Sequence, residues 1–293
     1  MFGLLAHGMW GLFPLYWPLL KPSAAEEILA HRVAWSLVTC LVLLAVVRGG
    51  TRILALAREP RRAAALTAAA VFLGINWYVY IWAVNHGHVV EAALGYFVNP
   101  LIAVLLGVGV LGERLRPLQW VAVAVGAAAV LVLTVDYGRP PWIALVLAGS
   151  FAAYALLKKV AAMPAVEGLT IETLVLFLPA TAYLVWHTST GAGTFTSAGT
   201  THAVLLASTG VVTAIPLLWF AGAANRLPLS TLGLLQYLTP VLQFLLGVLV
   251  FHETMPVARW AGFCLVWLAL AVFTVEAVRY QRRSLRVALD ALT

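Results

Sequence analysis

The sequence predicts an all-α integral membrane protein with about ten transmembrane helices, arranged as two inverted repeats of five helices. Three observations lead to this prediction: the apolar composition, the distribution of basic residues, and an internal repeat. Hydrophobic residues make up 63% of the 293 residues and charged residues only 10%, whereas a soluble domain is about half apolar and a quarter charged. This composition excludes a water-soluble enzyme and a disordered chain.

Long apolar segments supply the predicted helices, because about 20 apolar residues cross about 30 Å of hydrocarbon. The runs are continuous, whereas a membrane β-barrel requires alternating strands of about ten residues. The first run begins at Phe2 without a charged leader or a cleavage site, so we expect it to be retained as a helix. The predicted segments are residues 3–20, 31–48, 63–85, 90–111, 117–135, 141–158, 169–187, 202–224, 230–251 and 257–278.

Basic residues are concentrated in alternate connections between these segments. If the N-terminus lies inside, fourteen of the 18 Lys and Arg residues fall in inside connections or the C-terminal tail, and four fall outside. This asymmetry is typical of membrane proteins, and omission of one helix would reverse every later loop. The sequence therefore predicts a multi-pass protein of the cytoplasmic membrane with both termini in the cytoplasm.

An internal repeat relates the two halves of the chain at an offset of 140 residues. It runs without a gap from the third to the fifth predicted helix and again from the eighth to the tenth. Because five is an odd number, the second copy enters the membrane inverted, as in many secondary transporters. We predict a first half over residues 1–140, an inverted second half over 141–279, and a basic cytoplasmic tail over 280–293. The matched pairs include Asn85 with Asn225, Pro100 with Pro240, Glu113 with Glu253, and Trp120 with Trp260.

Several motifs carry a resemblance to a known family. Residues 75–85 read Ile-Asn-Trp-Tyr-Val-Tyr-Ile-Trp-Ala-Val-Asn, residues 91–100 read Glu-Ala-Ala-Leu-Gly-Tyr-Phe-Val-Asn-Pro, and residues 27–32 read Glu-Ile-Leu-Ala-His-Arg. With Leu-Gly-Glu at 111–113 and the Leu-Gly and Gln-Tyr pairs at 232–233 and 236–237, these stretches resemble the RarD-like branch of the EamA family, in the drug/metabolite transporter superfamily. The second copy departs from the pattern, with His252 where the first has Gly112.

The resemblance implies ten helices in two inverted halves and the function of a permease. It implies that the cargo is a small organic metabolite or drug and that transport runs outward, and the inverted repeat predicts that transport proceeds by alternating access. Two other functions stay open at this stage: a flippase for a lipid-linked carrier, and an integral membrane enzyme with a His/Glu site.

Polar side chains inside the predicted helices are the candidates for substrate binding. Asn76 and Tyr80 are four residues apart and share a helix face, and Gln236 and Gln243 are two turns apart. Polar groups at membrane depth face the bundle interior or a wet cavity. The alternative is that each one forms a hydrogen bond between helices. The predicted substrate-binding set is Trp10, Asn76, Tyr80, Tyr96, Asn99, Tyr154, Gln236 and Gln243.

A second set of residues is predicted to gate the site or to carry a proton. Pro100 and Pro240 are equivalent in the repeat, so they predict paired hinges, with static kinks as the alternative. Glu91 and His31 are the preferred proton carriers. We expect Arg32 to pair with Glu91 as an outer gate, or else to extend to the interface.

The remaining motifs predict no cofactor and no metal. His86 and His88 lie in a short loop without cysteines or paired carboxylates at ligand spacing. Phosphate-binding loops of the GxxxxGK[ST] type are absent from the sequence, which argues against ATP-driven transport by this chain alone. The net charge of +7 reflects cytoplasmic loops, so no nucleic-acid partner is expected. The expected partners are the lipid bilayer and a small-molecule substrate, and a homodimer stays open.

Overall fold

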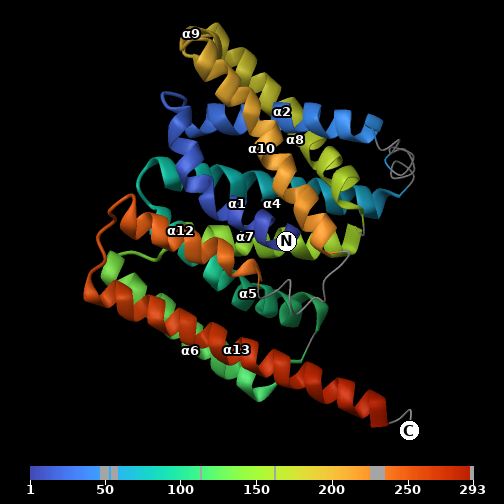
Figure 1. Cartoon of the computed structure of the whole chain (residues 1–293), viewed down its shortest axis with the longest axis vertical. Helices are drawn as coiled ribbons and strands as arrows, with labels where there is room; N and C mark the ends of the chain where they lie inside the picture. The colour runs from blue at the N-terminus through green and yellow to red at the C-terminus, as the bar shows by residue number, and fades with distance from the viewer. Residues whose placement is uncertain (47–52, 54–58, 113, 162, 225–234, 291–293) are drawn as a thin grey trace.

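The computed structural model describes residues 1–46, 53, 59–112, 114–161, 163–224 and 235–290, and helices are the only regular elements within them (Figure 1). An all-α protein was predicted, and this prediction is confirmed. Glu113 and the start of the predicted segment 230–251 lie outside the described residues. The elements are α1 (Phe2–Tyr16), η1 (Trp17–Leu20), α2 (Ala25–Val46), α4 (Pro60–Asn85), α5 (Val89–Leu111), α6 (Pro117–Tyr137), α7 (Trp142–Ala161), α8 (Ala165–Ser189), α9 (Thr194–Ser197), α10 (Thr200–Ala224), α12 (Leu238–Leu249) and α13 (Val257–Asp290).

Two helices extend well beyond the apolar segments that predicted them. The α2 helix begins at Ala25 instead of residue 31, and its first turn contains Glu26 and Glu27. Acidic side chains stabilise the first turn of a helix, where unpaired N–H groups carry partial positive charge. The α13 helix continues to Asp290 instead of ending at residue 278, because its polar end is rich in residues of high helix propensity.

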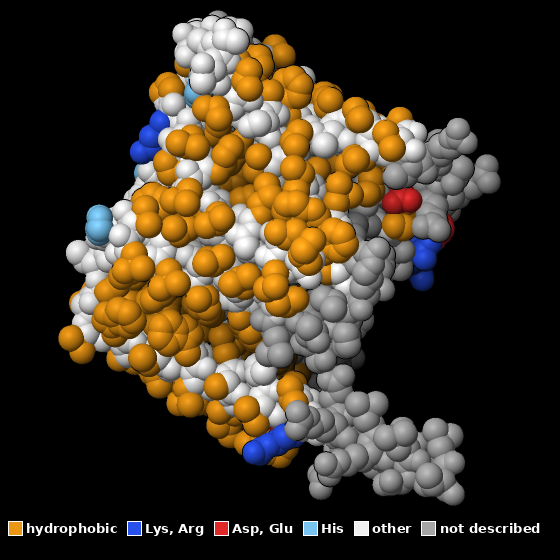
Figure 2. Space-filling model, viewed as in Figure 1, with side chains coloured by type: hydrophobic (Ala, Val, Ile, Leu, Met, Phe, Trp, Pro, Cys, Tyr) orange, Lys and Arg blue, Asp and Glu red, His pale blue; other side chains and the backbone are white. Residues whose placement is uncertain are grey.

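Within the described chain, seven helices are long and apolar enough to cross a membrane: α2, α4, α5, α6, α8, α10 and α13. Their outward faces carry large apolar side chains such as Val135, Leu178 and Val257. Figure 2 shows hydrophobic side chains over most of the visible face, with few charged ones. A surface this apolar is stable in contact with lipid, so the chain is a multi-pass membrane protein.

The helices pack as two groups of three and two pairs. One group contains α4, α5 and α7, and the other contains α10, α12 and α1, with α7 and α1 each packed on both other members of its group. The pairs are α2 with α8 and α6 with α13, and α6 lies beside α13 along one edge in Figure 1. The α5 helix also packs on α12, which joins the two groups of three.

Glycines allow close approaches between these helices. A Cβ atom added at Gly95 of α5 would lie 2.9 Å from the carbonyl oxygen of Ala144 in α7. A Cβ atom at Gly247 of α12 would lie 2.7 Å from the side chain of Val90 in α5. Small residues at such positions permit van der Waals packing between helix backbones, which is a main source of helix association in membranes.

Candidate functional site

The buried cation Arg32 lies where four helical elements meet. Its Nε donates a hydrogen bond to Thr213 Oγ1 of α10 at 3.0 Å. Its guanidinium carbon lies 3.9 Å from the ring centre of Trp77 in α4 and 5.0 Å from that of Trp17 in η1. The residue is only 4% exposed. The expectation that Arg32 extends to the interface is therefore wrong, because aromatic rings hold the guanidinium inside the protein.

Two predicted site residues from α4 and one from α5 lie together beside this cation. Asn76 donates from Nδ2 to the carbonyl oxygen of Leu147 at 3.0 Å and to Ser150 Oγ at 3.1 Å. Tyr96 contacts the Asn76 side-chain oxygen at 3.5 Å, and its ring packs edge-on against that of Tyr80. These contacts fix the α4 and α5 polar residues against α7.

Another pair of predicted residues lies in the other helix group. Gln243 of α12 donates to the carbonyl oxygen of Trp10 in α1 at 3.2 Å, and its own side-chain oxygen has no partner among the described residues. One helical turn away, Thr239 donates to the carbonyl oxygen of His7 at 3.0 Å. These hydrogen bonds between helices match the alternative that polar residues hold the bundle together.

The predicted residue Tyr154 contacts a buried ion pair. Its hydroxyl donates to Glu172 Oε2 of α8 at 3.3 Å, and Lys158 of α7 lies 2.7 Å from Glu172 Oε1. Glu172 is fully buried, so the charge on Lys158 offsets much of the cost of burying that carboxylate. Tyr154 of α7 is thus bound to α8 through Glu172 in this structure.

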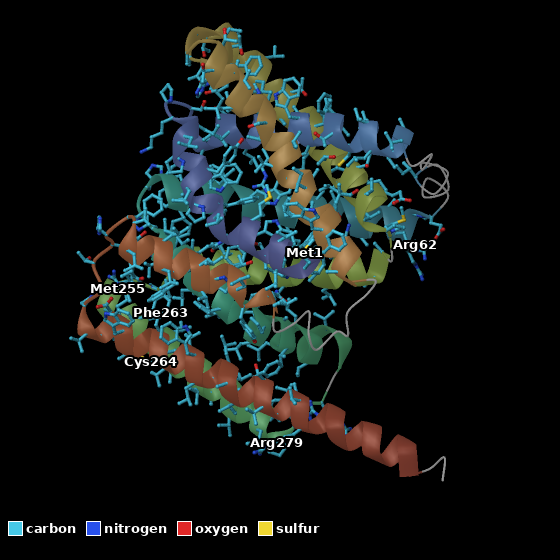
Figure 3. The ribbon with its side chains drawn as sticks, in the orientation of Figure 1. Met1, Arg62, Met255, Phe263, Cys264 and Arg279 are labelled. Atoms are coloured by element: carbon cyan, nitrogen blue, oxygen red, sulfur yellow. The ribbon has the colours of Figure 1, made fainter. Side chains whose placement is uncertain are left out.

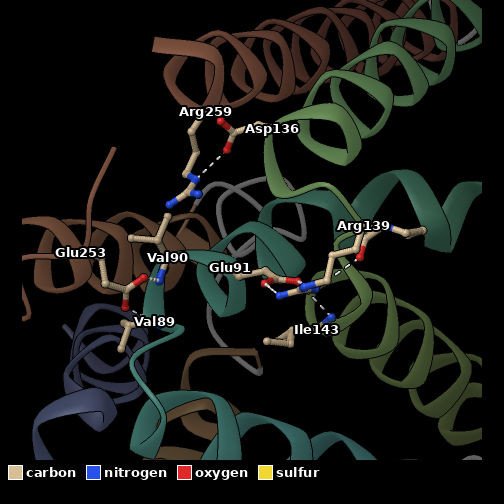
Figure 4. A network of polar contacts seen from close by, with 9 residues as sticks. Val89, Val90, Glu91, Asp136, Arg139, Ile143, Glu253 and Arg259 are labelled. Carbon is tan, nitrogen blue, oxygen red and sulfur yellow. Dashed lines mark hydrogen bonds and ion pairs between the residues drawn. The ribbon is translucent and has the colours of Figure 1, made fainter. Parts of the chain in front are cut away.

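Glu91 has a different partner from the one expected. Arg139 pairs with it, with Nη2 at 2.9 Å from Glu91 Oε2, and the backbone N–H of Ile143 donates to Glu91 Oε1 at 3.2 Å. The expected pair of Arg32 with Glu91 is therefore not formed. The reason is positional, because Glu91 lies in the first turn of α5 next to the start of α7 (Figure 4).

The same figure shows a second carboxylate that joins two helices. Glu253, in the connection between α12 and α13, accepts hydrogen bonds from the backbone N–H groups of Val89 and Val90 at the start of α5. Burial raises the pKa of the Glu253 carboxyl above its usual range, while the two N–H groups act in the opposite direction. Nearby, Arg259 pairs with Asp136 at 3.0 Å and joins α13 to α6.

His31 lies next to the short α9 helix. Its ring stacks on Phe195 with 4.7 Å between the ring centres. One turn earlier in α2, Glu27 accepts hydrogen bonds from the backbone N–H of Thr194 and from its hydroxyl. The predicted proton carriers His31 and Glu91 thus belong to separate polar clusters.

The structure separates the other predicted residues. Gln236 is exposed, Asn99 is buried with no partner for its side-chain oxygen among the described residues, and Pro100 lies inside the continuous α5 helix. Pro240 lies in the first turn of α12, directly after a turn at Tyr237. The paired hinge at the two prolines stays a prediction.

Sequence reasoning missed several contributors to these clusters, among them Trp17, Glu253 and the pairing of Lys158 with Glu172. Trp17 was not singled out, although it falls one residue before a proline at the end of the first apolar run. Glu253 was recognised as a repeat match but not as the cap of α5. The pairing of Lys158 with Glu172 has a visible signal, since they are opposite charges inside two consecutive apolar segments.

No metal centre is visible in the part of the chain that the structure describes, where no three His, Cys, Asp or Glu side chains lie together at ligand distances. His86 and His88 instead stack against the ring of Trp82, at 4.4 and 5.7 Å between ring centres.

Comparisons with known proteins identify the family. Residues 1–135 match the EamA-like transporter family. Protein RarD of Streptomyces exfoliatus is 59% identical over 292 residues, which cover 99% of this chain and 92% of that protein. Protein RarD of Escherichia coli K12 is 41% identical, with 97% and 96% covered. A protein of Bacillus subtilis 168 named as the uncharacterized transporter YojE is 43% identical, with 94% and 93% covered.

A solved structure supports the fold independently. One crystal structure superimposes on this chain with a TM-score of 0.58 at 20% sequence identity, covering 94% of this chain and 97% of the other. At this identity the likeness concerns the fold alone. Taken with the sequence matches and the apolar helices, it leads to one conclusion: the chain belongs to the EamA-like transporter family of the drug/metabolite transporter superfamily, among the RarD proteins, and is a membrane transporter.

Proposed function

We propose that the chain is a secondary transporter of the cytoplasmic membrane that moves a small organic metabolite or drug, outward, by alternating access. In this proposal ten helices cross the membrane as two inverted halves, residues 1–140 and 141–279. The two halves rock against each other and expose one site to each side in turn.

The observation that carries this proposal is the pattern of helix packing. Under the 140-residue offset, α1 corresponds to α7, α2 to α8, α4 to α10, α5 to α12 and α6 to α13. The most extensive contacts follow this exchange: α4 packs on α7 as α10 packs on α1, α5 packs on α7 as α12 packs on α1, and α2 packs on α10 as α8 packs on α4. The pairs α2–α8, α5–α12 and α6–α13 map onto themselves, as expected for helices that face each other across a two-fold axis.

The ends of the helices support the orientation. Met255 and Arg62 lie on opposite sides of the molecule (Figure 3). Arg62 belongs to the basic connections expected in the cytoplasm, so Met255 and its neighbour Glu253 would face outward. In the present conformation, Glu253 and Glu91 tie helices together at that outer end, whereas Glu113, the repeat partner of Glu253, lies outside the described residues.

The orientation has a direct test with single cysteines. Arg114→Cys and Thr254→Cys would be introduced separately into a chain whose Cys40 and Cys264 are replaced by alanine. A membrane-impermeant maleimide applied to intact cells should label the cysteine at 254 and not the one at 114. Labelling of both positions from one side would overturn the inverted repeat.

Transport itself is tested in proteoliposomes. A panel of small organic acids, amines and neutral drugs is first screened by thermal shift on the purified chain, because bound substrate stabilises by mass action. Compounds that stabilise it are then assayed for flux, with and without a pH gradient. Absence of flux above empty liposomes for every stabilising compound would overturn the proposal, and flux indifferent to the gradient would exclude proton coupling.

A further inference from the structure

We propose that Arg32 binds the carboxylate of an apolar monocarboxylic acid, so that the guanidinium and the aromatic rings around it form the anion-binding part of the transport site. This inference rests on the proposed function and specifies its substrate class. Four observations carry it: an uncompensated charge, a set of unused donors, the surrounding rings, and the position between the helix groups.

The charge on Arg32 is not neutralised by any acidic residue that the structure describes. The ion pairs found in the described ranges give four buried carboxylates other partners: Glu91 with Arg139, Asp136 with Arg259, Glu172 with Lys158, and Glu276 with Arg116. The buried carboxylate of Glu27 accepts hydrogen bonds from the backbone N–H and the hydroxyl of Thr194. An isolated buried charge is costly unless it is paired. A negatively charged ligand would complete this pairing.

Unused hydrogen-bond donors lie around the guanidinium. Nε of Arg32 donates to Thr213, which leaves the two Nη groups without a hydrogen bond among the described residues. The hydroxyl of Tyr80 and the indole N–H of Trp17 are buried and have no partner among the residues that the structure describes, and the Trp17 ring lies 5.0 Å from the guanidinium carbon. Tyr80 is 3% exposed and Trp17 is 0% exposed. Since buried donors without partners destabilise a fold, a cluster of them indicates an absent acceptor.

The surroundings favour one charge and an apolar body. A single buried cation balances a single negative charge, so a phosphate dianion would leave an uncompensated charge. A planar carboxylate matches the two parallel N–H groups of a guanidinium. The rings of Trp77, Trp17 and Phe13 lie 3.9 to 6.0 Å from the guanidinium carbon, and Tyr80 and Tyr96 pack against each other nearby. These rings would contact the apolar part of the ligand.

The position of Arg32 couples binding to both helix groups. It extends from α2, hydrogen-bonds Thr213 of α10 in one group, and stacks on Trp77 of α4 in the other. An anion bound here would neutralise a charge at the junction of the two groups. Occupancy would therefore alter how they pack against each other, which is what a carrier requires of its substrate.

The test is a thermal-shift experiment on the full chain in detergent at constant ionic strength. Benzoate is compared with benzamide, its uncharged isostere, and with phenyl phosphate. At about ten times its Kd, benzoate should raise Tm by about 3 °C. Benzamide should give no shift, and phenyl phosphate a smaller one. Arg32→Gln should abolish the benzoate shift, whereas Arg62→Gln, which removes an exposed cation paired with Glu59, should keep it.

The outcomes separate binding from a structural role. If Arg32 only holds helices together, Arg32→Gln lowers the Tm of the ligand-free protein, and the wild type responds equally to benzoate and benzamide. That combination of results overturns the proposal. So does a benzoate shift that survives in Arg32→Gln, or a larger shift with phenyl phosphate than with benzoate. Absence of a shift with both benzoate and its longer homologue 4-phenylbutyrate overturns it as well. The proposal expects the ligand-free Tm of Arg32→Gln to match the wild type or exceed it.

Failure of this inference is distinguishable from failure of the proposed function. Benzoate binding that depends on Arg32, without flux in proteoliposomes, would reject the transporter mechanism and retain the anion site. Flux of amines or neutral compounds by a protein that ignores carboxylates would reject the anion site and retain the transporter.

Discussion

Glu253 caps the first turn of α5 by accepting a hydrogen bond from the backbone N–H of Val90 at 3.1 Å. The carboxylate belongs to the connection between α12 and α13, so one side chain ties this connection to the start of α5. Helix starts need such partners because their first four N–H groups have none within the helix.

Removal of this cap should destabilise the protein. Glu253→Ala is expected to reduce the free energy of unfolding by about 1 to 2 kcal/mol, the usual loss for a helix cap. Hydrogen exchange of the first turn of α5 should rise with it. Glu59→Ala, which removes an exposed carboxylate paired with Arg62, should change the stability by less than about 1 kcal/mol. Equal effects of the two variants would contradict the capping role.

The pH dependence of stability should also report Glu253. Burial raises the pKa of this carboxyl, so the folded chain holds the proton more tightly than the unfolded chain. Its contribution is fully present below the unfolded pKa of about 4.3 and is lost as pH rises through the higher folded pKa. Glu253→Gln cannot titrate, so its Tm profile between those two values should be flatter than that of the wild type. An unchanged profile would contradict this assignment.

The Lys158–Glu172 pair predicts non-additive mutations. Lys158→Met leaves the carboxylate of Glu172 buried without its cation, which should cost about 3 kcal/mol or more. The double variant Lys158→Met with Glu172→Leu removes both charges and should recover most of that loss. A double variant less stable than the single one, measured by chemical or thermal unfolding, would show that the pair itself stabilises the fold.

The close approach of α5 and α7 at Gly95 predicts that two glycine substitutions differ in their effect on the stability of the protein. Gly95→Ala places a methyl group 2.9 Å from the backbone of α7 and should destabilise the protein by about 1 to 3 kcal/mol. Gly149→Ala meets no atom within 4 Å and should be neutral or stabilising by up to about 1 kcal/mol, because alanine favours the helix. The comparison requires only the two Tm values, and an equal loss in both would refute the packing argument.

Substitution of either of two polar residues should abolish transport and leave the protein folded. Asn99→Ala removes a side-chain oxygen that has no partner among the described residues, and Gln236→Ala removes an exposed amide. We expect both variants to keep the wild-type Tm and to lose flux of an identified substrate in proteoliposomes. Ser189→Ala, at the end of α8, is the matched control. Wild-type flux in either variant would remove that residue from the site.

Much of the fold was predictable from the sequence because hydrocarbon imposes a length on every apolar segment. Each of the ten predicted segments overlaps a helix, and the boundaries fail where charge enters a helix, as at Glu26 of α2 and in the polar end of α13. Hydropathy does not include the favourable effect of carboxylates at a helix start.

The candidate site was less predictable, because side-chain partners depend on which helices meet. The sequence placed Asn76 and Tyr96 inside helices and did not specify their shared contact. The sequence indicated that Arg32 and Glu91 are opposite charges at similar depth in the membrane. In the structure Arg139, which lies shortly after α6, forms the ion pair with Glu91 instead. Pairing in the bundle is decided by helix neighbours that are distant in the chain.

The contacts of α1 have a consequence for how the protein is made. This helix is synthesised before its packing partners α10 and α12, and α10 begins only at Thr200. At a synthesis rate of about 5–20 residues per second, roughly 10 to 40 seconds pass between the synthesis of α1 and that of these partners. A nascent chain that stalls after residue 140 would therefore leave α1 unpartnered in the lipid, a natural substrate for membrane quality control.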